Sequence, residues 1–355
     1  MIFDFLTLNF IVLTALIIII FLSVLIIVHE LGHFLLAKKF GVLVEEFGIG
    51  LPPKIFSRKK GETTYSVNAL PIGGFVKILG ENREEETEMK NAVSQERIFY
   101  NLKIWKRFLI ISGGVAMNFI LGWFLVSLIF AVGIPKAVII TQVMSDGPAE
   151  KIGIKANDKV IGFSDVNEFV GFIDQHRGEV VSLRIERGKE ELIFEITPRK
   201  NPPKNEGALG VALVEAGQER LGILKSVWEG LKTSAEIFSI IFIAIFNLLK
   251  MAILGKASLE GIAGPVGIVK ITNQASQMGL VYLIQLLALI SINLAAINIF
   301  PFPALDGGRL LFLIIEKITG KPLPKRFEQY VNAVGFAFLI LLMALVTIKD
   351  IRRLF

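Results

Sequence analysis

Long uncharged apolar stretches constrain the fold of this 355-residue chain more than any other feature. A helix needs about 20 apolar residues to cross a bilayer. Three uncharged runs exceed that length, Phe5–Val28, Phe108–Pro135 and Ile271–Leu305, and a fourth, Val331–Ile348, is just long enough. With 53% hydrophobic residues and a mean hydropathy of +0.63, the chain is predicted to be a multi-pass α-helical membrane protein with four transmembrane helices.

A short apolar run and the first long run each need a separate interpretation. The run Ile237–Leu249 is uncharged for 13 residues before Lys250, which favours an interfacial amphipathic helix over a fifth crossing. The run Phe5–Val28 lacks a basic segment before it and a small-residue cleavage site after it. It is therefore expected to stay in the protein as a membrane span and not to act as a signal peptide.

Basic residues cluster around one loop, which predicts the orientation in the membrane. They follow the first span at Lys38, Lys39, Lys54, Arg58, Lys59 and Lys60, and they precede the second span at Lys103, Lys106 and Arg107. The positive-inside rule places this loop in the cytoplasm and the N-terminus outside. Because the net charge of +6 comes largely from residues that flank apolar runs, we expect the lipid bilayer as a partner and no nucleic acid.

Within the cytoplasmic loop, Val42–Phe56 and Thr63–Ile78 are rich in β-branched and aromatic residues, and Gly61 lies between them. This pattern predicts a β-hairpin. The acidic run Glu84–Glu88 that follows is predicted to be a solvated surface segment.

Residues 136–215 have the character of a small soluble α+β domain. Strands are predicted at Ala137–Val143, Val180–Glu186 and Glu191–Pro198, and a helix near Val166–His176. Because the domain follows a span that leaves the cytoplasm, it should be extracytoplasmic. The predicted organisation is an N-terminal membrane half (1–135), the soluble domain (136–215), a linker with the interfacial helix (216–270) and a C-terminal membrane half (271–355).

The sequence His29-Glu30-Leu31-Gly32-His33 ends the first apolar run. Residues four apart on a helix differ by about 40° around its axis, so both imidazoles can reach one metal ion. Glu30 lies beside them, where its carboxylate can take a proton from an attacking water. The alternative is a set of polar residues that simply marks the end of a span. Ionisable groups in a membrane are costly to bury, which favours the metal site.

A zinc site built on this motif needs a third protein ligand. The chain has no cysteine and its one other histidine, His176, lies in the soluble domain, so the ligand should be a carboxylate. Asp306 is the first carboxylate after the third apolar run, whereas Glu316 lies beside Lys317 and is better explained as a paired helix-end charge. If Ile237–Leu249 does not cross, the third span runs inward and Asp306 arrives level with the histidines.

Four motifs in this order are similar to those of the site-2 protease family of intramembrane zinc metalloproteases, and more narrowly to its bacterial RseP-type (regulator of sigma-E protease) members. They are the pentapeptide at 29–33, Asn-Ala-Leu-Pro-Ile-Gly-Gly-Phe-Val-Lys at 68–77, Gly-Pro-Val-Gly-Ile at 264–268 and the segment Asn298–Gly308. The resemblance implies that His29, His33 and Asp306 bind one Zn²⁺ and that Glu30 is the catalytic general base. It also implies that Asn298 contacts substrate.

The same resemblance makes the hairpin with Gly73 and Gly74 a membrane re-entrant hairpin, which presents an edge strand to an unwound substrate. The soluble domain resembles a single circularly permuted PDZ domain through Val143–Ile154 and Asp158–Ile161. In this PDZ-like domain, peptide binding and exclusion of bulky substrates remain alternatives.

The expected function is intramembrane proteolysis of single-pass membrane proteins, such as an anti-sigma factor or a remnant signal peptide, in the bacterial inner membrane. Two other functions compete with it. A metal transporter would place polar residues at several depths along a pathway. A catalytically inactive scaffold with a PDZ domain would have a damaged motif, whereas Glu30 and the three expected ligands are all present. The sequence leaves the substrate and the oligomeric state open.

Overall fold

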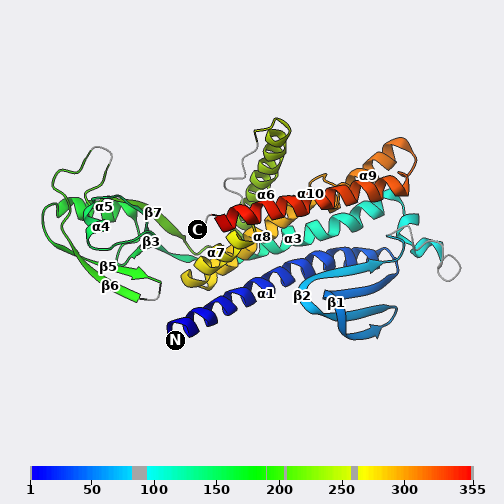
Figure 1. The fold of residues 1–355 in the computed structure, drawn as a ribbon, viewed down its shortest axis with the longest axis horizontal. Coiled ribbons are helices and arrows are strands. Elements are labelled where there is room, and N and C mark those ends of the chain that lie inside the picture. The colour runs from blue at the N-terminus through cyan, green and yellow to red at the C-terminus, as the bar shows by residue number, and fades with distance from the viewer. Residues whose placement is uncertain (1, 82–93, 189, 204–205, 257–262, 353–355) are drawn as a thin grey trace. The chain divides into compact units, whose positions relative to one another are not determined.

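The computed structural model describes residues 2–81, 94–188, 190–203, 206–256 and 263–352 (Figure 1). The chain divides into two compact units. The membrane unit comprises the residues up to Val126, Gly230–Ser276 and the residues from Leu283 onward, and the soluble unit comprises Ser127–Glu229 and Gln277–Tyr282. The acidic run Glu84–Glu88 lies outside the described residues.

Helices carry most of the apolar sequence. They are α1 (Ile2–Lys39), α3 (Ile104–Val132), α6 (Ile223–Ile253), α7 (Pro265–Met278), α8 (Leu280–Ile299), α9 (Asp306–Thr319) and α10 (Lys325–Arg352). In the part of the chain that the structure describes, α1, α3, α6, α8 and α10 are long and apolar enough to cross a membrane, judged by length and composition. The chain is thus a multi-pass membrane protein with a soluble domain.

Two predicted segments differ from the helices that form. The third apolar run is divided at Gly279, whose φ of +115° separates α7 from α8, and it ends as a helix at Ile299, before Pro301. The run Ile237–Leu249 is part of α6, which has 31 residues because its charged first half is helical too. Helix length therefore does not separate an interfacial from a crossing position for α6.

The predicted hairpin is present as β1 (Val44–Lys60) and β2 (Thr63–Ile78), joined at Gly61. Each strand bends back on itself. Glu46–Ile49 has partners on both sides, Thr64–Val67 on one and Gly74–Lys77 on the other, so it is an inner strand. Lys54–Lys60 pairs with Thr63–Asn68 alone among the described residues. The sheet therefore has two edges, one formed by the end of β2 and the other by Lys54–Lys60.

The hairpin runs along α1. Near its turn, Lys38 Nζ donates to Glu62 Oε1 at 2.7 Å, and Arg97 pairs with the same carboxylate. These two cations hold the pKa of the Glu62 carboxyl below its usual range. At the other end, Ser23 Oγ donates to the Pro71 carbonyl. Since Ser23 and Lys38 are 15 positions apart, the hairpin extends about 22 Å along the helix.

Glycines let α1, α3 and α8 approach closely. A Cβ on Gly32 of α1 would overlap the backbone of Gly113 in α3, and one on Gly122 of α3 would overlap Ile292 of α8. Ser291 Oγ of α8 also donates to the Asn118 carbonyl of α3 at 2.7 Å. Small residues are typical of such backbone contacts between membrane helices.

The Gly-Pro-Val-Gly-Ile motif forms the start of α7, where a carboxylate from α10 caps it. The backbone N–H groups of Gly264 and Gly267 both donate to Asp350 Oδ2 at 2.8 Å. A carboxylate at a helix N-terminus satisfies orphan donors and favours the helix dipole. The motif therefore fixes α7 against the end of α10.

The soluble unit holds one five-stranded antiparallel sheet in the order β6-β5-β4-β3-β7. The strands are β3 (Ile134–Val143), β4 (Lys159–Val160), β5 (Val181–Arg187), β6 (Glu190–Ile196) and β7 (Val211–Gln218), and the helices are α4 (Pro148–Lys151) and α5 (Val166–Gln175). Asp165 caps α5 by accepting from Asn167 and Glu168 N–H. The three predicted strands and the predicted helix are confirmed, whereas β4 and β7 were not predicted.

A buried ion pair ties α3 to α9. Arg107 is 3% exposed, and its Nη1 donates to Glu316 Oε2 at 3.1 Å.

Removing one member of a buried pair leaves the other charge without compensation, which costs about 3–5 kcal/mol. We expect Arg107→Met to lower unfolding stability by that amount and Arg107→Met/Glu316→Leu to recover much of it. Arg97→Met, which breaks an exposed pair, is the control with an expected loss below about 1 kcal/mol. Equal losses from Arg107→Met and Arg97→Met in thermal unfolding would contradict the role of the buried pair.

Candidate metal centre

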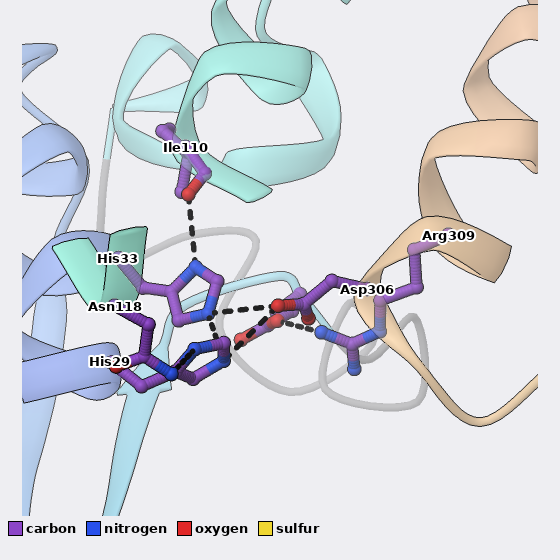
Figure 2. Close-up of polar contacts among 7 residues, drawn as sticks. His29, His33, Ile110, Asn118, Asp306 and Arg309 are labelled. Carbon is purple, nitrogen blue, oxygen red and sulfur yellow. Dashed lines mark hydrogen bonds and ion pairs between the residues drawn. The ribbon is translucent and has the colours of Figure 1, made fainter. Parts of the chain in front are cut away.

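Two histidines from α1 and one aspartate from α9 converge in the membrane unit (Figure 2). His29 and His33 are one turn apart on α1, and Asp306 is the first residue of α9. The two Nε2 atoms are 3.2 Å apart, and Asp306 Oδ2 lies 3.1 Å from His29 Nε2 and 3.5 Å from His33 Nε2. Asp306 is 277 positions from His29 and 273 from His33 in the sequence, yet the three ligand atoms converge on one point.

The geometry fits a tetrahedral zinc ion. Ligand atoms about 2.0–2.1 Å from a tetrahedral ion are separated by about 3.3 Å, close to the three distances observed. Apart from the two imidazoles, Asp306 Oδ2 is buried without a hydrogen-bond partner. A buried carboxylate oxygen in that position is costly unless a cation compensates it. His29, His33 and Asp306 would therefore hold the ion, with the fourth position open.

Each histidine makes a polar contact through Nδ1, the ring nitrogen that faces away from the cluster. His33 Nδ1 lies 2.9 Å from the Ile110 carbonyl of α3, which accepts its proton and leaves Nε2 free to ligate. His29 Nδ1 lies 3.3 Å from the Asn118 carboxamide of α3. Figure 2 shows Ile110 above His33 and Asn118 beside His29. Helix α3 thus fixes the orientation of both rings.

Asn118 of α3 makes an interhelical hydrogen bond with His29 of α1. It is 1% exposed, and its carboxamide oxygen has no partner as drawn. With the carboxamide rotated by 180°, that oxygen would accept from His29 Nδ1–H, which is the tautomer that ligates through Nε2.

We expect Asn118→Ala to weaken zinc binding by about 10- to 100-fold, measured by competition with a chromogenic chelator. The reason is that the replacement removes the group that orients His29. Asn298→Ala is the matched control, because Asn298 has no contact with the three residues among the described hydrogen bonds and ion pairs. Unchanged zinc affinity in Asn118→Ala would show that the carboxamide does not orient the ligand.

Gly114 of α3 lies against the ligand nitrogens of both histidines. A Cβ on Gly114 would overlap His33 Nε2, and it would lie 2.7 Å from His29 Cε1 and 2.8 Å from His29 Nε2. Ordinary Cβ contacts are much longer, so any side chain at this position would displace the ligand nitrogens.

The remaining predicted residues lie on elements that surround the cluster. A Cβ on Gly74 would be 3.7 Å from Glu30 Cγ, so the end of β2 passes next to the expected general base. Gly73 has φ +104° and packs against Leu51. Asn298 is partly exposed on the last turn of α8.

A cavity of about 320 Å³ lies along α9. Arg309, one turn after Asp306, pairs with Glu81, which follows β2. Both residues line the cavity, as do Arg107 and Glu316. Glu316, the competing carboxylate, is thus held by Arg107 and not by its neighbour Lys317.

Known proteins are similar in sequence to this chain over nearly its whole length. Residues 17–342 match the sequence profile of Peptidase family M50. The regulator of sigma-W protease RasP of Bacillus subtilis is 32% identical over 96% of this chain and 99% of its own length. The zinc metalloprotease RasP of Bacillus licheniformis is 31% identical over the same shares. A Clostridium perfringens protein described as a candidate zinc metalloprotease is 36% identical over 93% of this chain and 96% of its own length.

Proposed function

The chain belongs to peptidase family M50, and from this premise we propose that it cleaves single-pass membrane proteins within or next to their transmembrane segment. It is a site-2 type zinc metalloprotease. The observation that carries the proposal is the convergence of His29, His33 and Asp306 beside Glu30 at the end of an apolar helix. The relative in Bacillus subtilis is named for regulation of sigma-W, which makes an anti-sigma factor a suitable substrate.

In this proposal, His29, His33 and Asp306 hold zinc, which when bound supplies a Lewis acid that makes water nucleophilic near neutral pH. Glu30 takes a proton from the attacking water and passes it to the amide nitrogen of the leaving product. Ile110 and Asn118 keep the two imidazoles in the ligating orientation.

The edge of the hairpin supports a role in presenting substrate. Gly74–Ile78 pairs with Val44–Ile49 on one side only, among the described residues, and Gly74 lies against Glu30. A helical substrate hides its peptide bonds, whereas a segment added to this edge as a strand would expose them. We therefore assign Gly73 and Gly74 to substrate binding. Asn298 is assigned to the same role on the resemblance of its segment alone.

The direction of α8 supports four crossings, with α6 at the interface. Ile299, at the end of α8, packs in the same cluster as Ile110 and Ile111 near the start of α3, and the middle of α8 around Ser291 contacts Asn118 and Gly122, so α8 runs antiparallel to α3. Because α3 also runs antiparallel to α1, α8 has the direction of α1 and must begin on the same side of the membrane. A crossing by α6 between α3 and α8 would reverse α8, since the 14 residues of α7 are too few to cross back.

The orientation and the soluble unit complete the proposal. The basic flanks support an active site near the cytoplasmic side of the bacterial inner membrane, with the N-terminus and the soluble unit outside. The soluble unit would be a single PDZ-like domain that excludes substrates with bulky extracytoplasmic parts. A site at one depth supports proteolysis over a metal transporter, and the intact motif supports it over an inactive scaffold.

The test is cleavage of a single-pass substrate by the full-length protein in vesicles. We expect cleavage near the cytoplasmic end of the transmembrane segment, loss of cleavage on chelation and recovery when zinc is returned. A stable poly-leucine segment should be cut more slowly than one with central Gly and Pro, because it resists unwinding. Metal flux across the vesicle without any cleavage would instead support a transporter.

A further inference from the structure

The outer edge of the hairpin is formed by Lys54–Lys60, on the side of the sheet away from Gly74–Ile78. This segment pairs with Thr63–Asn68 on one side only, among the described residues, and every one of its residues is exposed. It is therefore a free surface of the membrane unit. Nothing in the proposed chemistry uses it.

The character of this outer strand changes along its length. Ile55 and Phe56 are 70% and 60% exposed, which is unfavourable for large apolar side chains in water. Arg58, Lys59 and Lys60 follow directly and end at the Gly61 turn. One strand thus has an apolar part and a basic part, each of which is exposed.

The contacts of the hairpin with α1 give the two parts different depths. The turn beside Lys60 is held by the pair of Glu62 with Lys38, in the last turn of α1. The opposite end of the hairpin reaches Ser23, about 22 Å back along α1. Trp105 at the start of α3 is 53% exposed and packs against Phe40, two residues after Lys38, so Trp105 and Lys38 lie at the same level. Exposed tryptophan is typical of the membrane–water interface. With Lys38 at the cytoplasmic end of the span, as proposed above, the basic part would lie at the membrane surface and the apolar part in the hydrocarbon.

Among the described residues, the three basic side chains are without counter-charges. Lys54 pairs with Glu46 at 2.7 Å, and Lys38 pairs with Glu62. Arg58, Lys59 and Lys60 have no acidic partner among the described residues. Three adjacent unpaired cations at the level of the lipid headgroups are complementary to anionic phospholipids.

We propose that Arg58, Lys59 and Lys60 bind anionic phospholipid headgroups, and that this contact holds the hairpin at its depth beside the active site. The proposal rests on the membrane-inserted hairpin of the proposed function. Basic residues on an edge strand can also serve only to prevent edge-to-edge aggregation. That role requires neither the exposed apolar part nor the position of the basic part beside Lys38.

The absence of cysteine from the sequence permits a direct measurement of the lipids around the strand. A fluorophore on Ser57→Cys lies between the apolar and basic parts of the strand. The full-length protein is placed in phosphatidylcholine vesicles that contain a small fraction of headgroup-quencher lipid, either phosphatidylglycerol or phosphatidylcholine. We expect phosphatidylglycerol to quench at least about twice as strongly, and the difference to shrink with added salt.

The variant R58Q/K59Q/K60Q should make the two quenchers equal, whereas K151Q/K155Q/K200Q, which removes three cations from the soluble unit, should leave the difference intact. Equal quenching in the parent protein, or a difference that survives R58Q/K59Q/K60Q, would overturn the proposal. Quenching only by a water-soluble quencher would overturn the inserted hairpin as well. Because quenching does not depend on catalysis, a protein that cleaves its substrate but shows equal quenching keeps the proposed function and loses this inference.

Discussion

Replacing Glu30 by glutamine will abolish most proteolysis while zinc stays bound. The carboxamide has nearly the shape of the carboxylate but cannot accept a proton, and a positioned general base contributes about 10²- to 10⁴-fold to a rate. Glu30 is not among the three residues whose ligand atoms converge, so its replacement leaves the ligand set complete. The measurements are the cleavage rate in vesicles and the zinc content of the same preparation.

Glu96→Gln is the control for this substitution, because Glu96 is an exposed carboxylate of the membrane unit. It should cleave at the parent rate. If Glu30→Gln cleaved at the parent rate, Glu30 would not be the general base. If Glu30→Gln lost zinc, its carboxylate would be part of the metal site, and the division of roles between Glu30 and Asp306 would be wrong.

Replacing Gly114 by alanine will remove zinc binding together with activity. The added methyl group would occupy the space of His33 Nε2 and would lie 2.8 Å from His29 Nε2. The site can accept it only if α3 moves away from α1 or both rings rotate, and either change separates the ligand nitrogens. We expect zinc affinity to fall by at least about 100-fold, more than the loss of an orienting hydrogen bond alone.

Gly171→Ala is the matched control, because Gly171 also lies within a helix and a Cβ there meets nothing within 4 Å. That variant should bind zinc and cleave as the parent does, and it should be slightly more stable because alanine favours a helix. Parent-level zinc affinity in Gly114→Ala would show that α3 can yield at this point. The close fit between α3 and the imidazoles would then have no role in the site.

The features predicted correctly from the sequence are those that depend on neighbouring residues. Apolar runs predicted α1, α3, α8 and α10, because a helix in lipid needs a continuous apolar surface. β-Branched and aromatic residues on either side of Gly61 predicted the hairpin, and short alternating segments predicted three strands of the soluble sheet. The two short or late strands, β4 and β7, escaped prediction because two residues at Lys159–Val160 and a mixed sequence at Val211–Gln218 carry little periodicity.

Helix α6 (Ile223–Ile253) is longer than its uncharged part. The uncharged part has 13 residues, but the charged residues before it continue the same helix to a total of 31. Charge content therefore did not give the helix bounds. The contacts that bear on its position are those between α3 and α8, because they fix the direction in which α8 runs.

By itself, the sequence determined the membrane character of the chain, the spacing of His29 and His33 on one helix face, and a choice between two carboxylates for the third position. These depend on helix periodicity and on charge along the chain. Only the tertiary structure decided the rest. It placed Asp306 within 3.5 Å of both imidazoles, committed Glu316 to Arg107, and set Ile110, Gly114 and Asn118 against the two rings. The physical reason is that these contacts join residues far apart in the chain, and helix packing, not local sequence pattern, brings them together.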